Sequence, residues 1–203
     1  MFPVLPSTRT TAARGAARTS PGVRVGAVAA GTALLASTGC GVLSSDLRGE
    51  MPTDINVSSP MMQEGEPLPV AYTCGAEGDP VSPPLSWSGL PDDAGSIALV
   101  VDDPRDAVVF WLVYDLDPQL VELRQNTVPA DAKLGQNSAG DTAYGAPCPE
   151  EGDVHEYRFT VYALDGTLDL PEGAALDLTL EAIAEQAVAR GSLVTNSEST
   201  TSD

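Results

Sequence analysis

HEYRFTVYALD, which runs from His155 to Asp165, alternates between two kinds of side chain along its length. Successive side chains of a β-strand point to opposite faces, so every second residue of this stretch shares one face. That face holds His155, Tyr157, Phe159, Val161 and Ala163. The stretch therefore predicts a long β-strand with a core-facing side, and it places the only histidine of the chain on the same side as a tyrosine.

Two more apolar runs predict buried strands. They are SIALVVDD, Ser96–Asp103, and VVFWLVYDLD, Val108–Asp117. Only four residues separate the runs and Pro104 is one of them, so we expect the two strands to form a β-hairpin. Shorter strands are expected at Ile55–Ser58, Val70–Tyr72 and Leu85–Trp87.

One helix is predicted near the C-terminus, over Leu176–Ala189. Its apolar residues recur with the spacing of a single helical stripe, at Leu176, Leu180, Ile183, Ala184 and Ala187. Asp177 is a candidate for the cap at its start, and Gly191 fits its end. We expect a closing strand over Ser192–Asn196 and a disordered tail over residues 197–203.

Charge is divided unevenly along the chain. All 29 acidic residues follow Cys40, and only six basic residues do, which gives that part a net charge of −23. So acidic a body repels nucleic acid and anionic membrane surfaces, and we expect no nucleic-acid partner. Few aromatic residues against 19 Gly and 17 Pro favour a loop-rich, mainly β domain.

Residues 1–39 have the features of a lipoprotein signal peptide. The segment up to Arg24 is basic and free of acids, the short apolar run VGAVAAGTALLAS follows, and small residues precede Cys40. Because STGC resembles a bacterial lipobox, we expect Cys40 to carry a lipid that anchors an exported protein to the cell membrane. Ordinary cleavage nearby and an uncleaved anchor stay open. Residues 40–53 are predicted to be a flexible tether.

The other two cysteines, Cys74 and Cys148, form an even pair in an exported chain, which favours a disulfide. Two free thiols are the alternative. One histidine and two distant cysteines lack the paired spacing of a zinc site, so we expect no metal. No glycine-rich phosphate loop precedes a helix, and we expect no cofactor.

Four blocks in order carry a resemblance to a known family. They are YTCGAEGDPVSPPLSWSGLPDDAGSIALVVDDP, FWLVYDL, YGAPCPEEGDVHEYRFTVYALD and the C-terminal helix with its strand. They resemble the phosphatidylethanolamine-binding protein (PEBP) family, in its bacterial Raf-kinase-inhibitor-like subgroup, over residues 54–196. The resemblance implies a mainly β, sandwich-type fold with a large sheet, a smaller sheet and a C-terminal helix. It also implies one small pocket for phosphate or a phospholipid headgroup.

The resemblance assigns residues to this pocket. Asp103 matches the aspartate of the family's pocket, and His155 matches the pocket histidine. Tyr157 matches the tyrosine two positions after that histidine. Pro147 and Pro149 match prolines of the pocket loop. A charged imidazole oriented by Asp103 could hold a phosphate oxygen together with the Tyr157 hydroxyl. The alternatives are a structural His–Asp hydrogen bond, an aspartate that caps the turn at the following proline, and a tyrosine that belongs to the core.

The chain also departs from the family pattern at the pocket. Phe110 stands where the family has a second histidine, and Arg105 stands where a second acid is expected. Glu150 replaces a proline and Ala146 a glycine. We therefore expect a modified pocket with Phe110 among its residues.

Three functions are compatible with these features. The first is a lipid-anchored extracytoplasmic protein that binds a small anion or a phosphorylated headgroup. The second is an interaction or inhibitor module for an envelope protein, with a vestigial pocket and a working surface such as the long polar connection Gln119–Tyr144. The third, an envelope hydrolase, is disfavoured because the chain has no Gly-x-Ser-x-Gly motif, and we do not expect an enzyme.

Overall fold

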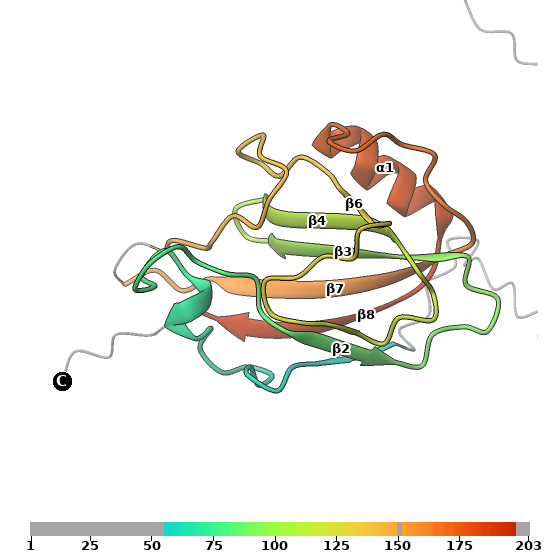
Figure 1. Ribbon diagram of the computed structural model, residues 1–203. Coiled ribbons are helices and arrows are strands. Elements are labelled where there is room, and N and C mark those ends of the chain that lie inside the picture. Colours follow the sequence, from blue (N-terminus) through green and yellow to red (C-terminus); the bar gives the residue numbers. More distant parts are fainter. Residues whose placement is uncertain (1–54, 150–151, 198–203) are drawn as a thin grey trace, which may run out of the picture. The chain divides into compact units, whose positions relative to one another are not determined.

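The alternating stretch after His155 forms a central strand of the larger of two sheets. In the computed structural model, which describes residues 55–149 and 152–197, this sheet is antiparallel throughout and has the order β6-β4-β3-β7-β8. Its strands are β3 (Ser96–Asp103), β4 (Val108–Leu116), β6 (Lys133–Leu134), β7 (Glu156–Leu164) and β8 (Ala187–Asn196) (Figure 1).

A smaller antiparallel sheet packs on one face of the larger one. It consists of β1 (Asn56–Ser58), β2 (Leu85–Ser88) and β5 (Glu122–Leu123) in the order β1-β2-β5. Buried apolar residues of both sheets form one cluster, including Val57, Leu85, Trp87, Leu99, Trp111, Phe159 and Val161. The predicted two-sheet, mainly β fold is confirmed.

The helix α1 (Leu176–Gln186) covers the other face of the larger sheet, on the side of β4 and β6 in Figure 1. Ile183 of this helix belongs to a second buried cluster with Ala98, Val100, Leu112 and Tyr114. Because alternate residues of β3 enter different clusters, both faces of this strand are covered, which explains its almost continuous apolar sequence.

The same alternation separates the two carboxylates at the end of β3. Asp103 continues the face of Leu99 and contacts His155, whereas Asp102 continues the opposite face and pairs with Arg158. The predicted hairpin between β3 and β4 is present, with residues 104–107 as its turn. One strand end therefore supplies an acid to each face of the sheet.

The C-terminal helix is shorter than predicted. It ends at Gln186, and β8 begins at once with Ala187. Residues 187–189 fit helical and strand spacing alike, but here Ala187 and Ala189 pair with Leu164 and Ala163 of β7, with a bulge between them. This pairing overrides a weak helical preference. Asp177 lies in the first turn and is not the cap, which is Ala175.

Gly191 does not end the helix, as the sequence suggested, but lies in the middle of β8. A Cβ atom at this position would be 1.7 Å from the carbonyl oxygen of Ile55. Only glycine lets the backbone of Ile55 pass so close to the strand.

Two connecting segments also differ from the predictions. Val70–Tyr72 forms a 3₁₀ turn instead of a strand, stabilised by a hydrogen bond from the Tyr72 N–H to the Pro69 carbonyl. The connection Gln119–Tyr144 contains β5 and β6. The buried Asn137 side chain stabilises it by accepting hydrogen bonds from backbone N–H groups of the same segment.

Ser197 was predicted to begin the tail, but it is buried. Its hydroxyl oxygen accepts a hydrogen bond from the His155 N–H and donates one to the Asp153 carbonyl. The predicted signal peptide, Cys40, the tether up to residue 53, Glu150 and residues 198–203 lie outside the described residues. Within the described part of the chain, no helix has the length and apolar character needed to span a membrane.

Candidate functional site

A pocket of about 230 Å³ lies at the edge of the larger sheet where β7 begins. Its walls come from the end of β3 with the following turn, the start of β4, the loop before residue 150, and the start of β7. The lining residues are Asp103, Asp106, Val108, Phe110, Ala146, Cys148, Pro149, His155 and Tyr157. Five of the six predicted ligand-binding residues therefore line one pocket, and Pro147 does not.

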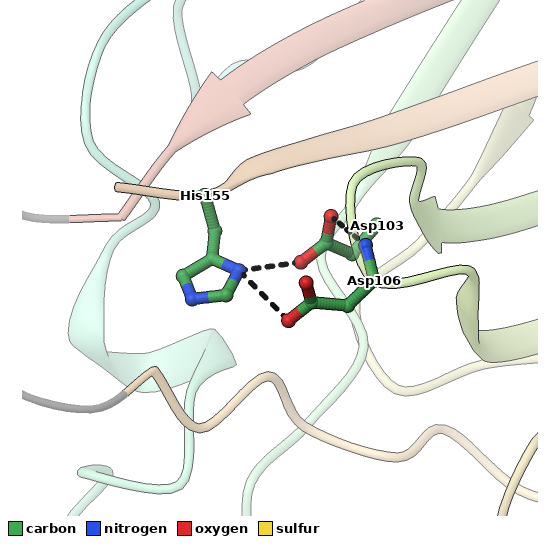
Figure 2. A group of neighbouring side chains, drawn as sticks. All are labelled: Asp103, Asp106 and His155. Carbon is green, nitrogen blue, oxygen red and sulfur yellow. Dashed lines mark hydrogen bonds and ion pairs between the residues drawn. The ribbon is translucent and has the colours of Figure 1, made fainter. Parts of the chain in front are cut away.

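His155 is held by one of its ring nitrogens. Nδ1 donates to Oδ2 of Asp103 at 2.6 Å, and Oδ2 of Asp106 lies 3.6 Å from the same nitrogen (Figure 2). Nε2 points away from both carboxylates, and among the described residues the acid paired with it is Asp153, at 3.9 Å. The hydrogen bond to Asp103 fixes the orientation of the ring and leaves Nε2 as the nitrogen available to a ligand.

Asp103 also shapes the hairpin turn. Its other oxygen, Oδ1, accepts hydrogen bonds from the backbone N–H groups of Arg105 at 2.8 Å and Asp106 at 3.3 Å. The Arg105 guanidinium donates to the carbonyl of Val154, which precedes the histidine. The two roles that the sequence left open for Asp103, orienting the histidine and capping the turn, are thus combined in one buried carboxylate.

Aromatic rings form the inner wall of the pocket. The Tyr157 ring is parallel to that of His155, with 6.2 Å between centroids, and Phe110 meets Tyr157 edge-on at 5.8 Å. Burial, together with the charges of Asp103 and Asp106, raises the pKa of Tyr157 to about 12. Its hydroxyl therefore keeps its proton at neutral pH, while Phe110 adds apolar surface where a second histidine was expected.

The pocket loop is fixed by a disulfide. Cys148 lines the pocket and is bonded to Cys74, so the structure contains the pair that the cysteine count favours. The Cys74 N–H also donates to the Pro147 carbonyl at 3.0 Å. Pro147 thus anchors the loop, and Pro149 forms part of the wall.

Asp106 is the pocket residue that sequence reasoning missed. The family pattern puts the expected second acid at the position of Arg105, but the turn brings the next residue toward His155. The signal was present in DDPRD, where an acid follows the arginine directly. Asp103, Asp106 and His155 offer ligand atoms within 4.8 Å of one another and could hold a divalent cation, which would have to displace the proton on Nδ1.

The two sheets and the C-terminal helix agree with comparisons to known proteins. The family model "Phosphatidylethanolamine-binding protein" matches residues 58–198. This chain belongs to the PEBP family. A protein of Mycobacterium tuberculosis named "Putative lipoprotein LppC" is 41% identical over 145 residues, which cover 69% of this chain and 70% of LppC. A UPF0098 protein of Methanothermobacter thermautotrophicus is 37% identical over 135 residues, or 63% of this chain and 87% of that protein.

Solved PEBP structures have the same fold. A PEBP homologue from Chlamydia trachomatis has a TM-score of 0.65 and 34% identity, covering 72% of this chain and 98% of its own. YbcL of Escherichia coli, described as a member of the mammalian PEBP family, has a TM-score of 0.66 and 27% identity over 72% of this chain and 99% of its own. The large sheet, small sheet and C-terminal helix are therefore the PEBP fold.

Proposed function

We propose that this PEBP-family protein is an envelope lipoprotein that binds a phosphorylated headgroup in the pocket beside His155. One observation carries the proposal: the hydrogen bond from Nδ1 to Asp103 leaves Nε2 of His155 available in a pocket that the Tyr157 ring also lines, parallel to the imidazole and with its hydroxyl protonated. These two groups can donate to two oxygens of one phosphate group.

The charges of the pocket favour a headgroup over free phosphate. Asp103 and Asp106 lie at Nδ1 of His155 and Asp153 lies 3.9 Å from Nε2, so even a cationic imidazole leaves this group with a net negative charge. A bare phosphate dianion is opposed by the Asp106 carboxylate, whose side chain is half exposed. A zwitterion such as phosphoethanolamine can place its ammonium group near Asp106 and its phosphate near Nε2.

The proposed location rests on the N-terminal sequence and on one relative. The STGC sequence ending at Cys40 resembles a lipobox, with Ser37 where Leu is usual, and one relative carries the name "Putative lipoprotein LppC". A lipid at Cys40 would keep the pocket at the outer side of the cell membrane, where phospholipid headgroups are abundant. Mass spectrometry of the mature N-terminus tests this part: a diacylglyceryl cysteine supports it, and an unmodified N-terminus contradicts it.

We also propose that the site binds its ligand without catalysis. A hydrolase of the serine type needs a hydroxyl within reach of His155. Ser96 lies at the opposite end of β3 from Asp103, and its hydroxyl donates to the Gly166 carbonyl. Ser86 belongs to the small sheet. These positions support a binding role for His155.

NMR of the single histidine tests the ligand proposal. The ring signals of His155 in the full-length protein are followed while phosphate and phosphoethanolamine are added in separate titrations. We expect saturable shifts with both, and tighter binding of phosphoethanolamine. Asp106→Asn should reduce the difference between the two ligands, and Tyr157→Phe should weaken both by about tenfold, the value of one charge-assisted hydrogen bond.

Arg124→Gln is the matched control because Arg124 is exposed and, within residues 55–149 and 152–197, its one ion pair is with Glu122. It should leave both titrations unchanged. Ring signals that do not respond to either ligand would contradict the proposal. The same fold would then act through its surface, as an interaction module.

A further inference from the structure

A second pocket lies on the opposite face of β7 from Tyr157. It has a volume of about 380 Å³ and is built mainly by two paired strands, β7 and β8. Thr160 stands opposite Ser192, and Tyr162 stands opposite Arg190 in this pairing. The lining residues are Ile55, Arg158, Thr160, Tyr162, Arg190, Gly191 and Ser192.

This pocket has an unusual charge for such an acidic chain. The protein has 29 acidic and only ten basic residues, yet the lining contains two arginines and, among the described residues, no carboxylate. Asp102 lies beside the pocket and pairs with Arg158. The pocket is therefore a local basic site on a protein whose net charge is strongly negative.

The two arginines differ in what they already bind. Nε and Nη2 of Arg158 donate to the two carboxylate oxygens of Asp102. These bonds hold the guanidinium against the sheet and leave Nη1 to donate to a ligand. Arg190 is exposed and forms no ion pair with any carboxylate in the described part of the chain. Burial raises the pKa of Tyr162, and Arg190 is the largest opposing influence, which places this cation close to the phenol.

Hydroxyl groups complete the lining. Thr160 and Ser192 share a hydrogen bond of 2.8 Å between their oxygens. One hydroxyl proton serves this bond, so the other proton can be donated to a ligand. The Tyr162 hydroxyl lies on the same face, two residues further along β7. Fixed guanidinium and hydroxyl donors on one rigid sheet face match the oxygens of a phosphate group.

We propose that this pocket is a second binding site, specific for a phosphate group, in which Arg190 and Nη1 of Arg158 supply the charge and the hydroxyls of Ser192 and Tyr162 supply further hydrogen bonds. The site shares no lining residue with the pocket at His155. It needs no movement of Asp102, which continues to hold Arg158.

The position of the pocket suggests where its phosphate comes from. Ile55 forms part of its wall, so the chain enters the described domain at this pocket. If Cys40 carries a lipid, as proposed above, 15 residues link the lipid to Ile55 and span at most about 50 Å. A phospholipid headgroup of the same membrane is then within reach, and a soluble phosphate compound is the other source.

The first experiment is a titration of the full-length protein with inorganic phosphate at constant ionic strength, followed by amide NMR. We expect saturable shifts at Thr160 and Ser192. Arg190→Gln should weaken this binding by about tenfold, which corresponds to a lost charge-assisted contact. Arg124→Gln should not change it, and His155→Ala should remove only the response of the first pocket. Absent shifts, or equal effects of Arg190→Gln and Arg124→Gln, would overturn the proposal.

A second arm identifies the source of the phosphate. Binding of the full-length protein to phosphatidylcholine vesicles is compared with binding to vesicles that also contain phosphatidylglycerol. All variants share one N-terminus, so a difference between Arg190→Gln and Arg124→Gln on the anionic vesicles reports this pocket alone. Such a difference supports the site with a lipid headgroup as its ligand. If the two variants differ in their binding of inorganic phosphate but not in their binding of vesicles, the result supports the site with a soluble ligand.

Discussion

Asp103 combines two structural tasks in one side chain. Its Oδ1 atom caps the turn between β3 and β4, and its Oδ2 atom holds the imidazole of His155. The carboxylate is buried, so neither contact can be replaced by water at low cost. The turn and the histidine are therefore coupled, and a change at Asp103 should disturb both.

Asp103→Asn should lower the free energy of unfolding by about 2 kcal/mol, because the amide keeps the shape of the side chain but loses a charge-assisted hydrogen bond. Asp106→Asn is the control, since its carboxylate is half exposed and lies farther from Nδ1. It should cost less than about 1 kcal/mol. Urea unfolding of the three proteins measures both values. Equal losses of unfolding free energy would show that the hydrogen bond between Asp103 and His155 contributes no more to stability than the longer contact of Asp106.

At the scale of elements, β8 depends on Gly191 in its centre. The backbone of Ile55 crosses the strand there, and this crossing brings the chain from the N-terminus onto the fold. It also forms one wall of the basic pocket. A glycine that looks like the end of a helix in the sequence is therefore a close-contact position in a strand.

Gly191→Ala should destabilise the protein by about 3 kcal/mol, because the new methyl group would overlap the Ile55 carbonyl and one backbone segment must move. Gly166→Ala is the matched control. Its added Cβ would meet only the end of the Gln186 side chain, at 3.6 Å. Thermal unfolding of both variants checks the prediction, and an unchanged melting temperature for Gly191→Ala would contradict the role of the crossing.

The disulfide is the other element-scale constraint, because it joins the pocket loop to the segment after η1 (Val70–Tyr72). Removing it in the Cys74→Ser, Cys148→Ser double variant should cost about 2 to 4 kcal/mol of stability. Binding at His155 should weaken as well, since Cys148 lines that pocket. Unfolding with and without reductant provides the control: reductant should destabilise the natural chain and leave the double variant unchanged.

The long strands could be predicted from the sequence because their apolar runs or alternation extend over many residues. β3, β4 and β7 have eight or nine residues each with clear apolar runs or alternation. Two-residue strands such as β5 and β6 carry no periodicity and exist through tertiary pairing. Residues 187–189 fit both the helical and the strand spacing of apolar residues, and only the pairing with β7 decides between the two structures.

The candidate site was predictable to the extent that it follows strand geometry. Tyr157 in β7, His155 just before that strand, and Asp103 at the end of β3 lie on one face because of the alternation along each strand. Asp106 depends on the conformation of a turn, which no periodicity encodes. The basic pocket needs residues from β7 and β8 together, so it becomes visible only when Arg158 and Arg190 are placed on neighbouring strands.

At the scale of the whole molecule, the negative net charge and the buried tyrosine side chains together affect how stability depends on pH. The chain carries a net charge of −19 and five tyrosines. Burial raises the pKa of every one of these tyrosines: Tyr72, Tyr114, Tyr144, Tyr157 and Tyr162. The folded protein thus keeps its phenols neutral under conditions in which they would add further negative charge to an already acidic body.

This arrangement predicts a loss of stability at alkaline pH. In the unfolded chain the phenols ionise near pH 10, whereas the folded pKa values are higher, about 12 for Tyr157. Below about pH 10 both states hold these protons, so the tyrosines leave stability unchanged. Above it the unfolded chain releases protons that the folded chain retains, and the free energy of unfolding should fall steadily up to at least about pH 12.

Urea unfolding at a series of pH values measures this decline, and tyrosinate absorbance in the ultraviolet reports ionisation in the same samples. We expect the absorbance to rise together with unfolding, not before it. Tyr157→Phe should make the decline shallower, because it removes one of the five groups, and Phe fits the apolar surroundings formed with Phe110. Full ionisation near pH 10 in a chain that is still folded would show that burial does not protect the phenols, and it would contradict the predicted decline.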